Sequence, residues 1–137
     1  MKTLFKITTV FLILTSCQIT KIAVYDSYSH QNTVALKVRI DQLISKSQEN
    51  YATHQTEMKA LLLELQQQYA YEKSKPNNAV TVAMFSRIIG SEKTLLPQFF
   101  AMWRQNEQLS PAFTKEAAKQ ISETFDQIII LETQKIK

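Results

Sequence analysis

Histidine and cysteine are the side chains best suited to metal binding or nucleophilic catalysis, and this 137-residue sequence has two histidines and one cysteine. His54 and Glu57 are three residues apart, so a helix would place both on one face, where they could supply two metal ligands. A complete site needs a second such pair, and the sequence offers none, at His30 or elsewhere. Because His54 also falls in step with Tyr51 and Met58, we expect it to pack in a seam between helices. We therefore predict no metal and no cofactor.

The carboxylates give no clear catalytic pair. Glu64, Glu72, Glu116 and Glu123 are expected on polar helix faces near lysines, where solvated ion pairs are the favoured interpretation. Gly90 is the only glycine, so a glycine-rich loop that cradles phosphate is excluded. We predict no catalytic residues. An enzyme would need a cleft with two or more titratable groups of shifted pKa.

The single cysteine follows an apolar N-terminal segment. Two lysines precede an apolar run over residues 7–14, and two small residues, Thr15 and Ser16, come directly before Cys17. A membrane-spanning helix needs about 20 apolar residues, which is far more than this run contains. The length and the flanking residues fit a secretory signal peptide.

The residues Leu14-Thr15-Ser16-Cys17 resemble the lipobox of bacterial lipoprotein precursors, which is an aliphatic residue, two small residues and a cysteine. The resemblance covers residues 1–17 only. It implies that a diacylglycerol is attached to the Cys17 thiol and that the peptide is cut directly before it. Two or three acyl chains would hold the protein firmly to a membrane, because each buried methylene contributes about 0.8 kcal/mol. The alternatives are an ordinary signal peptide with a fortuitous cysteine, or a short buried helix.

Gln18 bears on the location within the envelope. In many Gram-negative lipoproteins an aspartate directly after the cysteine retains the protein at the inner membrane, and this chain has glutamine there. The resemblance therefore implies the periplasmic face of the outer membrane, with the cell surface as the alternative. A Gram-positive host would leave the protein on its single membrane.

The composition favours an all-α domain. Average usage predicts roughly ten glycines in a chain of this length, and one is present, which leaves few positions for the tight turns of β-sheets. Apolar residues make up 45% of the chain, enough for a core. We predict a small bundle of three to five helices, with residues 1–16 as signal peptide, 17–30 as a lipidated tether and 31–137 as the helical domain. The apolar tether residues are expected to pack on the domain rather than lie at the membrane interface: Ile22, Val24, Tyr25 and Tyr28.

Apolar residues in steps of three and four predict helix over residues 33–73, with a kink or break near residues 47–56, where the sequence is polar. Pro76 ends this helix, and Asn78 is expected to cap the next one, which stops at Gly90.

Two further helices are predicted. One begins near Thr94 with Pro97 in its first turn, and the last begins at Ser110-Pro111, a hydroxyl cap followed by proline at the first helical position. The apolar stripe of the last helix is Phe113, Ala117, Ile121, Phe125, Ile128 and either Leu131 or Glu132.

Two apolar clusters, residues 95–103 and 127–131, are too wide for one face of an amphipathic helix. Four consecutive residues cover about 300° of a helix, so neighbouring helices must enclose them or they form a surface patch. Aromatic residues and arginine dominate interface energetics. The candidate partner-binding residues are Phe99, Phe100, Trp103, Arg104, Ile129 and Ile130. The core is nevertheless the expected place for at least two of the three aromatic ones.

The charge and the absence of catalytic motifs point to a binding role. The net charge is +4, and Lys2 and Lys6 of the N-terminal segment contribute to it, so the small excess does not favour nucleic acid. We expect a non-catalytic accessory or adaptor lipoprotein that docks on an envelope assembly, such as a secretion or conjugation machine, through helix-in-groove contacts. The alternatives are a surface lipoprotein that binds a host or phage component or blocks DNA entry, and an envelope enzyme. The sequence leaves the oligomeric state open.

Overall fold

The computed structural model describes residues 22–136, which form five α-helices and no β-strand. The helices are α1 (Ser27–Ser45), α2 (Tyr51–Ser74), α3 (Ala79–Ile89), α4 (Leu95–Asn106) and α5 (Pro111–Gln134), and the short 3-10 turn η1 (Lys46–Gln48) follows α1. The prediction of a small all-α bundle is confirmed. Cys17 and the signal-like segment lie outside the described residues, and none of the described helices is long and apolar enough to cross a membrane.

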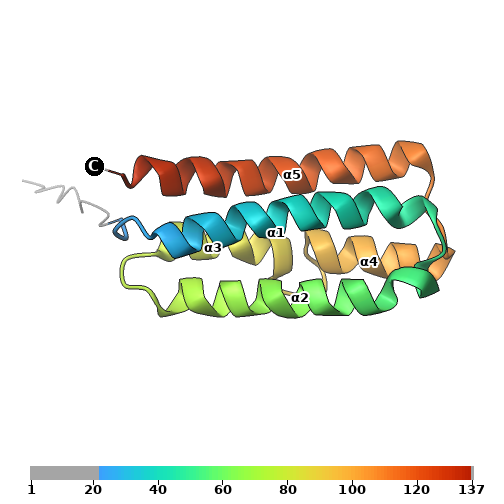
Figure 1. Ribbon diagram of the computed structural model, residues 1–137, viewed down its shortest axis with the longest axis horizontal. Helices are drawn as coiled ribbons and strands as arrows, with labels where there is room; N and C mark the ends of the chain where they lie inside the picture. The colour runs from blue at the N-terminus through green and yellow to red at the C-terminus, as the bar shows by residue number, and fades with distance from the viewer. Residues whose placement is uncertain (1–21, 137) are drawn as a thin grey trace, which may run out of the picture.

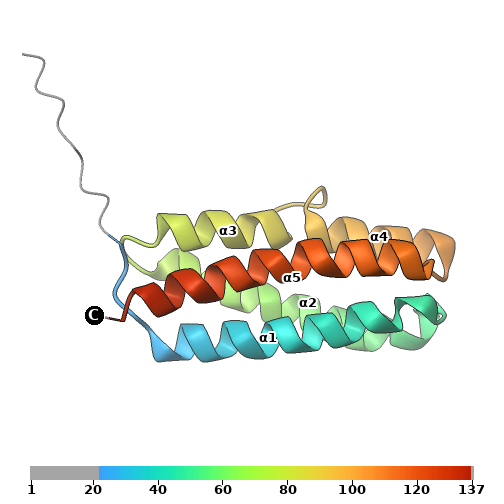
Figure 2. The ribbon, with the colours of Figure 1, turned by 90° about the horizontal axis from the view of Figure 1, so that it is seen from above.

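The helices form an up-down-up-down bundle whose third member is split in two. α2 and α5 both run antiparallel to α1 along its length, and α3 and α4 follow one another along the remaining side (Figure 1). The short connection between α3 and α4 is visible in Figure 2. We call the end formed by residues 22–28, 71–80 and 132–136 the proximal end. The distal end holds the connections α1–α2 and α4–α5.

The predicted break in the first helical region is present. α1 ends at Ser45 and α2 begins at Tyr51, where the Asn50 side chain accepts a hydrogen bond from the Ala52 N–H at 2.9 Å. α1 itself begins at Ser27, because Asp26 caps it. Residues 27–30, which we expected in the tether, are therefore the first turn of a helix.

Of the four apolar tether residues, Tyr25 is half-buried, whereas the other three do not pack as expected. Ile22 and Val24 are 57% and 86% exposed, Tyr28 is 58% exposed, and Ala23 between the first two is buried. Residues 22–26 have no regular structure. Only the Ala23 side chain of this stretch is buried on the bundle, which leaves its larger apolar neighbours in solvent.

Gly90 ends α3 as predicted, but not through a left-handed conformation, since its φ is −63°. The glycine is needed for close approach: a Cβ at this position would lie 2.5 Å from the Ser86 carbonyl oxygen. The Gly90→Ala substitution is expected to lower the free energy of unfolding by about 1–3 kcal/mol, as overpacking does, measured by urea denaturation. Adding Ser86→Ala should not restore stability, because the closest backbone atom remains. Full recovery in the double variant would contradict this explanation.

The starts of the last two helices agree with the sequence. Pro97 lies in the first turn of α4, and Ser110 accepts a hydrogen bond from the Phe113 N–H at 3.3 Å ahead of Pro111. The core contains Trp103 and two edge-to-face rings, Phe85 and Phe125, whose centroids are 6.5 Å apart.

The apolar stripe of α5 is confirmed in its middle, since Ile121, Phe125 and Ile128 are buried, whereas Phe113 and Ala117 are only partly buried. Of the two residues considered for its last position, Glu132 is the buried one. A carboxylate therefore occupies the end of the core stripe.

Candidate functional site

Two glutamates are completely buried at the proximal end, Glu72 near the end of α2 and Glu132 near the end of α5. Our prediction that Glu72 forms a solvated ion pair is wrong. The residue continues the inward-facing positions of α2, seven residues after buried Leu65 and four after buried Gln68. This spacing in the sequence already indicates an inward-facing position, but the polarity of the Gln68 and Glu72 side chains obscured it.

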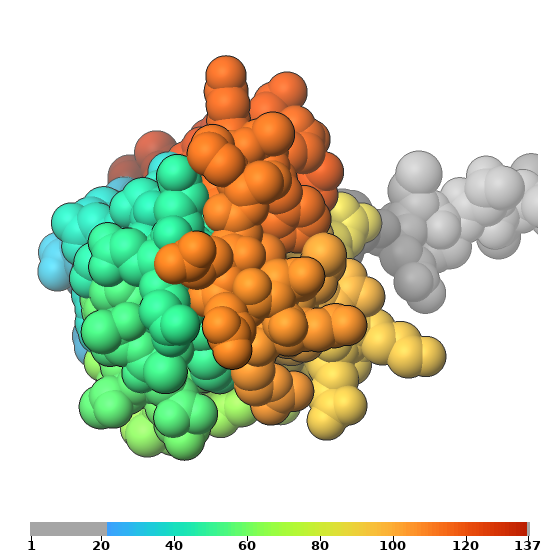
Figure 3. Space-filling view, turned by 90° about the vertical axis from the view of Figure 1, so that its right-hand side faces the viewer, coloured from blue at the N-terminus to red at the C-terminus, as the bar shows by residue number. Residues whose placement is uncertain are grey.

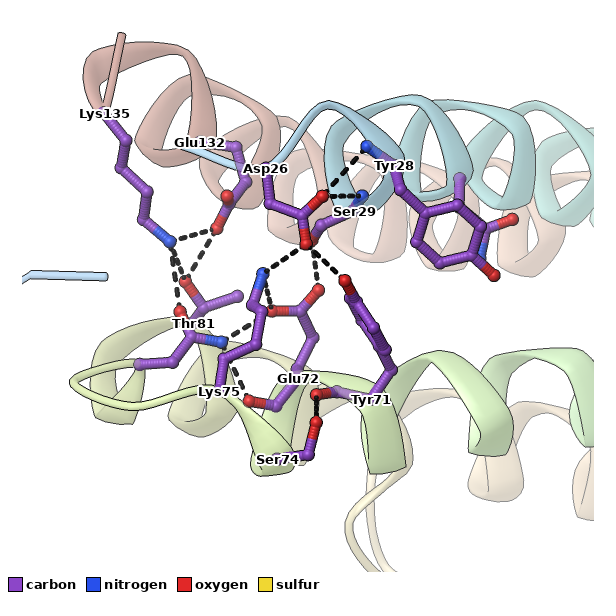
Figure 4. Close-up of polar contacts among 12 residues, drawn as sticks. Asp26, Tyr28, Ser29, Tyr71, Glu72, Ser74, Lys75, Thr81, Glu132 and Lys135 are labelled. Carbon is purple, nitrogen blue, oxygen red and sulfur yellow. Dashed lines mark hydrogen bonds and ion pairs between the residues drawn. The ribbon is translucent and has the colours of Figure 1, made fainter. Parts of the chain in front are cut away.

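Each carboxylate oxygen of Glu72 has a partner within the protein (Figure 4). Oε1 accepts hydrogen bonds from the Ser29 hydroxyl and from the Gln68 amide, the latter at 2.7 Å. Oε2 accepts from the Asn78 amide at 2.6 Å and lies 2.8 Å from the Lys75 Nζ. Such pairing is what a buried charge requires.

Glu132 belongs to the same network. Its Oε1 accepts from the Thr81 hydroxyl at 2.9 Å and from the Lys135 Nζ at 2.5 Å (Figure 4). Lys135 also donates to the Asn78 Oδ1 at 3.1 Å, so the Asn78 side chain joins the two glutamates. Asn78 stands at the N-cap position of α3 as predicted, but its side chain makes no capping bond, because it is engaged here.

Asp26 adds the N-terminal segment to this network. Its carboxylate accepts from the Tyr71 hydroxyl at 2.6 Å and from the Tyr28 and Ser29 N–H groups, and lies 3.6 Å from the Lys75 Nζ. Burial acts to raise the pKa of Asp26, but these hydrogen bonds and the Lys75 charge outweigh it and lower the pKa. The bond to Asp26 is the main cause that raises the pKa of Tyr71 to about 12.

The Asp26→Ala substitution is expected to lower the free energy of unfolding by about 1 kcal/mol through loss of the cap. It should also lower the Tyr71 pKa from about 12 toward its ordinary value of 10.0, which an absorbance titration of tyrosine measures. Asp26→Asn is the matched control, because asparagine keeps the cap without the charge.

The sign of the pH dependence follows from the lowered Asp26 pKa. The stabilisation by the carboxylate is present above the ordinary value of 3.8 and is lost as the pH falls through the folded-state pKa. The stability difference between the protein and its Asp26→Asn variant should therefore vanish in strong acid. A difference that persists there would contradict the role of the charge.

The second feature is an apolar groove of about 230 Å³ between α4 and α5. Its lining residues are Leu95, Gln98, Phe99, Met102, Phe113, Glu116, Ala117, Gln120 and Ile121. The Phe99 and Phe113 rings in it are stacked, with centroids 6.3 Å apart and planes at 8°. Glu116 is the one titratable side chain among the lining residues, and it accepts a hydrogen bond from Gln120 at 3.1 Å. The groove can hold apolar side chains with a polar or cationic group beside them.

Most of the candidate partner-binding residues do not line this groove. Phe99, Phe100 and Trp103 are 3%, 5% and 0% exposed, so all three belong to the core, and only Phe99 also lines the groove. Because α4 packs these three aromatic residues inward, they do not form an exposed surface. Arg104 is exposed. Of the α5 cluster, Ile130 is 56% exposed and Ile129 is half-buried, and neither lines the groove.

His54 lies in a seam, as predicted. Its ring packs on Trp103 with centroids 5.6 Å apart, and its Nε2 is 2.8 Å from Glu49 Oε2. Glu57 Oε2 is 3.7 Å from the other ring nitrogen. Residues 22–136 contain no cluster of three or more side chains that could hold a metal ion.

The two distal connections hold each other in place. The Tyr51 N–H donates to the Glu107 carbonyl and the Leu109 N–H donates to the Ser47 carbonyl, both at 2.8 Å. Figure 3 looks onto this end, where the green and turquoise residues around the α1–α2 connection lie against the orange residues around the α4–α5 connection. The groove is therefore built on helices whose connection is fixed to the rest of the bundle.

Comparison of the chain with protein-family models, curated proteins and solved structures gave no match. Function is therefore inferred from the residues themselves. Of the groove residues, sequence reasoning singled out only Phe99 for binding. The others recur in steps of three and four along α4 and α5, which was the available signal, but the pattern does not show that the two helices leave a gap between them.

Proposed function

We propose that this protein is a lipid-anchored component of the bacterial cell envelope that binds a protein partner and has a non-catalytic, accessory role. The observation that carries the proposal is Leu14-Thr15-Ser16-Cys17 directly after a positively charged and then apolar segment. Cys17 would carry the diacylglycerol, with the outer membrane as the site of anchoring. The described domain begins at Ile22, five residues later, so the bundle would remain close to the membrane.

The groove between α4 and α5 is the proposed binding site for the partner. Its stacked phenylalanine rings and aliphatic side chains suit the apolar residues of an amphipathic helix. Glu116 at the groove favours a lysine or arginine beside those residues, because a carboxylate attracts a cation at short range. The partner is therefore an envelope protein segment that presents apolar side chains next to a basic one.

The anchor is tested by intact mass spectrometry of the protein purified from its own membranes. The expected mass is that of a chain that starts at Cys17 and carries a diacylglycerol. The Cys17→Ala variant should take up no labelled fatty acid and should be found soluble or with its signal uncut. A bare thiol in the matured wild-type chain would refute the anchor.

The groove is tested by site-specific photocrosslinking in cells. A photoreactive residue at Gln98, which lines the groove, should crosslink to one envelope protein, whereas the same residue at exposed Lys59 on α2 should not. Ala117→Trp fills the groove and should reduce the crosslink about tenfold, which corresponds to about 1.4 kcal/mol of binding. Ala60→Trp, at an exposed position, is the control. A crosslink that survives Ala117→Trp in a folded variant would rule out the groove as the site.

A further inference from the structure

Four exposed aliphatic side chains lie at the proximal end, and others of similar exposure, such as Leu63 and Ile130, lie elsewhere on the bundle. Ile22 and Val24 precede α1, Val80 lies in the first turn of α3, and Ile136 follows α5; they are 57%, 86%, 44% and 57% exposed. Figure 1 shows these segments at one end of the bundle, and the bond from Thr81 to Glu132 joins two of them directly. The apolar residues therefore belong to one face of the molecule, which we call the proximal face.

The acidic groups of this end are withdrawn from that face. Among the described residues of the proximal end, the acidic side chains are Asp26, Glu72 and Glu132. The two glutamates are 0% exposed. Each acidic group is also near a lysine nitrogen: Asp26 and Glu72 are 3.6 and 2.8 Å from Lys75 Nζ, and Glu132 is 2.5 Å from Lys135 Nζ. The buried network thus presents little negative charge to the outside.

Positive charge remains at the surface of this end. Lys73, in the last turn of α2, is exposed and lies over the Tyr69 ring at 4.4 Å. An exposed lysine beside apolar side chains is favourable at the surface of an anionic membrane.

The distal end differs in its exposed charges. Two carboxylates, Glu49 and Glu107, and one cation, Arg104, are exposed there, and the Glu49 side chain is 64% exposed. These carboxylates would be repelled by an anionic surface. The two ends of the bundle are therefore not equivalent toward a membrane.

The length of chain before the structure agrees with this asymmetry. Cys17 precedes Ile22 by five residues, and five residues span at most about 18 Å when fully extended. A lipid at Cys17 would thus keep the proximal end within that distance of the bilayer. The distal end has no such constraint.

From these observations we infer that the proximal face contacts an anionic lipid bilayer directly, with Ile22, Val24, Val80 and Ile136 at the headgroup level and Lys73, at the edge of this face, as the cation that attracts the anionic lipids. The inference rests on the proposed lipid anchor and adds an orientation and a lipid chemistry to it. In this orientation the long axis of the bundle points away from the membrane surface, with the distal end farthest from it.

The test uses the full lipidated protein in vesicles of phosphatidylcholine and phosphatidylglycerol that contain a lipid-borne quencher. A fluorophore is attached to a cysteine introduced at Val80 or Ile136, or at exposed Gln48 in the distal turn η1 as the matched control. Quenching at the two proximal positions should exceed quenching at Gln48 by about threefold or more, as expected for side chains at the headgroup level. Equal quenching at the two ends would overturn the inferred orientation.

A charge substitution tests the lipid chemistry. A lysine near an anionic surface contributes about fivefold in binding. Because Lys73→Glu also adds a negative charge, it should reduce the proximal quenching in these vesicles by at least that factor, whereas Lys59→Glu, at an exposed position nearer the start of α2, should not. Proximal quenching that is unchanged by Lys73→Glu and equally strong in pure phosphatidylcholine would overturn the inferred preference for anionic lipid.

The mass of the same sample reports on the anchor separately. A Cys17 without diacylglycerol refutes the proposed function, and the orientation with it. A correctly lipidated chain without end-to-end asymmetry refutes the inferred orientation alone.

Discussion

The Glu72→Ala substitution is expected to lower the free energy of unfolding by about 3 kcal/mol or more. Glu72 is fully buried, and its two oxygens are the partners of Ser29, Gln68, Asn78 and Lys75. Alanine would leave these donors without their acceptor in the interior. Removing one member of a buried charge pair costs about 3–5 kcal/mol for this reason. Urea denaturation followed by circular dichroism measures the loss.

Two variants serve as controls for Glu72. Glu72→Gln keeps the shape and one acceptor oxygen, and should therefore cost less than alanine. Glu64→Ala removes a glutamate from the same helix whose side chain is 41% exposed and paired with Arg39, and should cost less than about 1 kcal/mol, as exposed ion pairs do. Equal losses for Glu72→Ala and Glu64→Ala would show that burial of the network does not stabilise the fold.

The Trp103→Ala substitution is expected to lower the free energy of unfolding by about 3–5 kcal/mol, the range for deleting a large aromatic side chain from a core. Trp103 is 0% exposed, and its ring is edge-to-face with that of Tyr51 at 5.7 Å. Its Nε1–H donates to the Glu49 carbonyl at 3.0 Å, so alanine would also leave that acceptor without its partner. Circular dichroism is the suitable measurement, because Trp103 is the only tryptophan and fluorescence would be lost with it.

Trp103→Phe separates packing from hydrogen bonding. Phenylalanine retains most of the aromatic contact and lacks the N–H, so the remaining loss should be about 1–2 kcal/mol. Met102→Ala, on the same helix but 41% exposed, is the control for substitutions in α4. A loss below about 1 kcal/mol for Trp103→Ala would contradict its core position and would renew the case for an interface.

Local signals in the sequence predicted the helix boundaries well. Ser110-Pro111, Pro97 and Gly90 act through a residue's own backbone or through neighbours within a few positions, so their effects are encoded locally. The composition predicted the fold class for a similar reason, because the scarcity of glycine limits the turns available. The start of α1 was placed too late, since the capping role of Asp26 was not recognised.

The interior charges could not be predicted in the same way. Glu64 and Glu72 are the same residue type on the same helix, and one is half-exposed whereas the other is buried. The difference depends on Ser29, which α1 brings to the end of α2, and on the fold of the connection after α2, which places Lys75 and Asn78 beside the Glu72 carboxylate. The groove depends on tertiary structure too, because its lining residues come from two different helices, α4 and α5.

The sequence by itself determined the all-α class, the main helix stops and the lipobox-like pattern at Cys17, on which the predicted anchor depends. The tertiary structure alone decided that all three candidate aromatic residues lie in the core, where at least two were expected, that two glutamates are buried, and that Ile22, Val24, Val80 and Ile136 lie at one end of the bundle. The physical reason is the separation along the chain over which each interaction acts. Helix caps and turns act between residues close in sequence, whereas burial and surface composition depend on which distant segments the packed helices bring together.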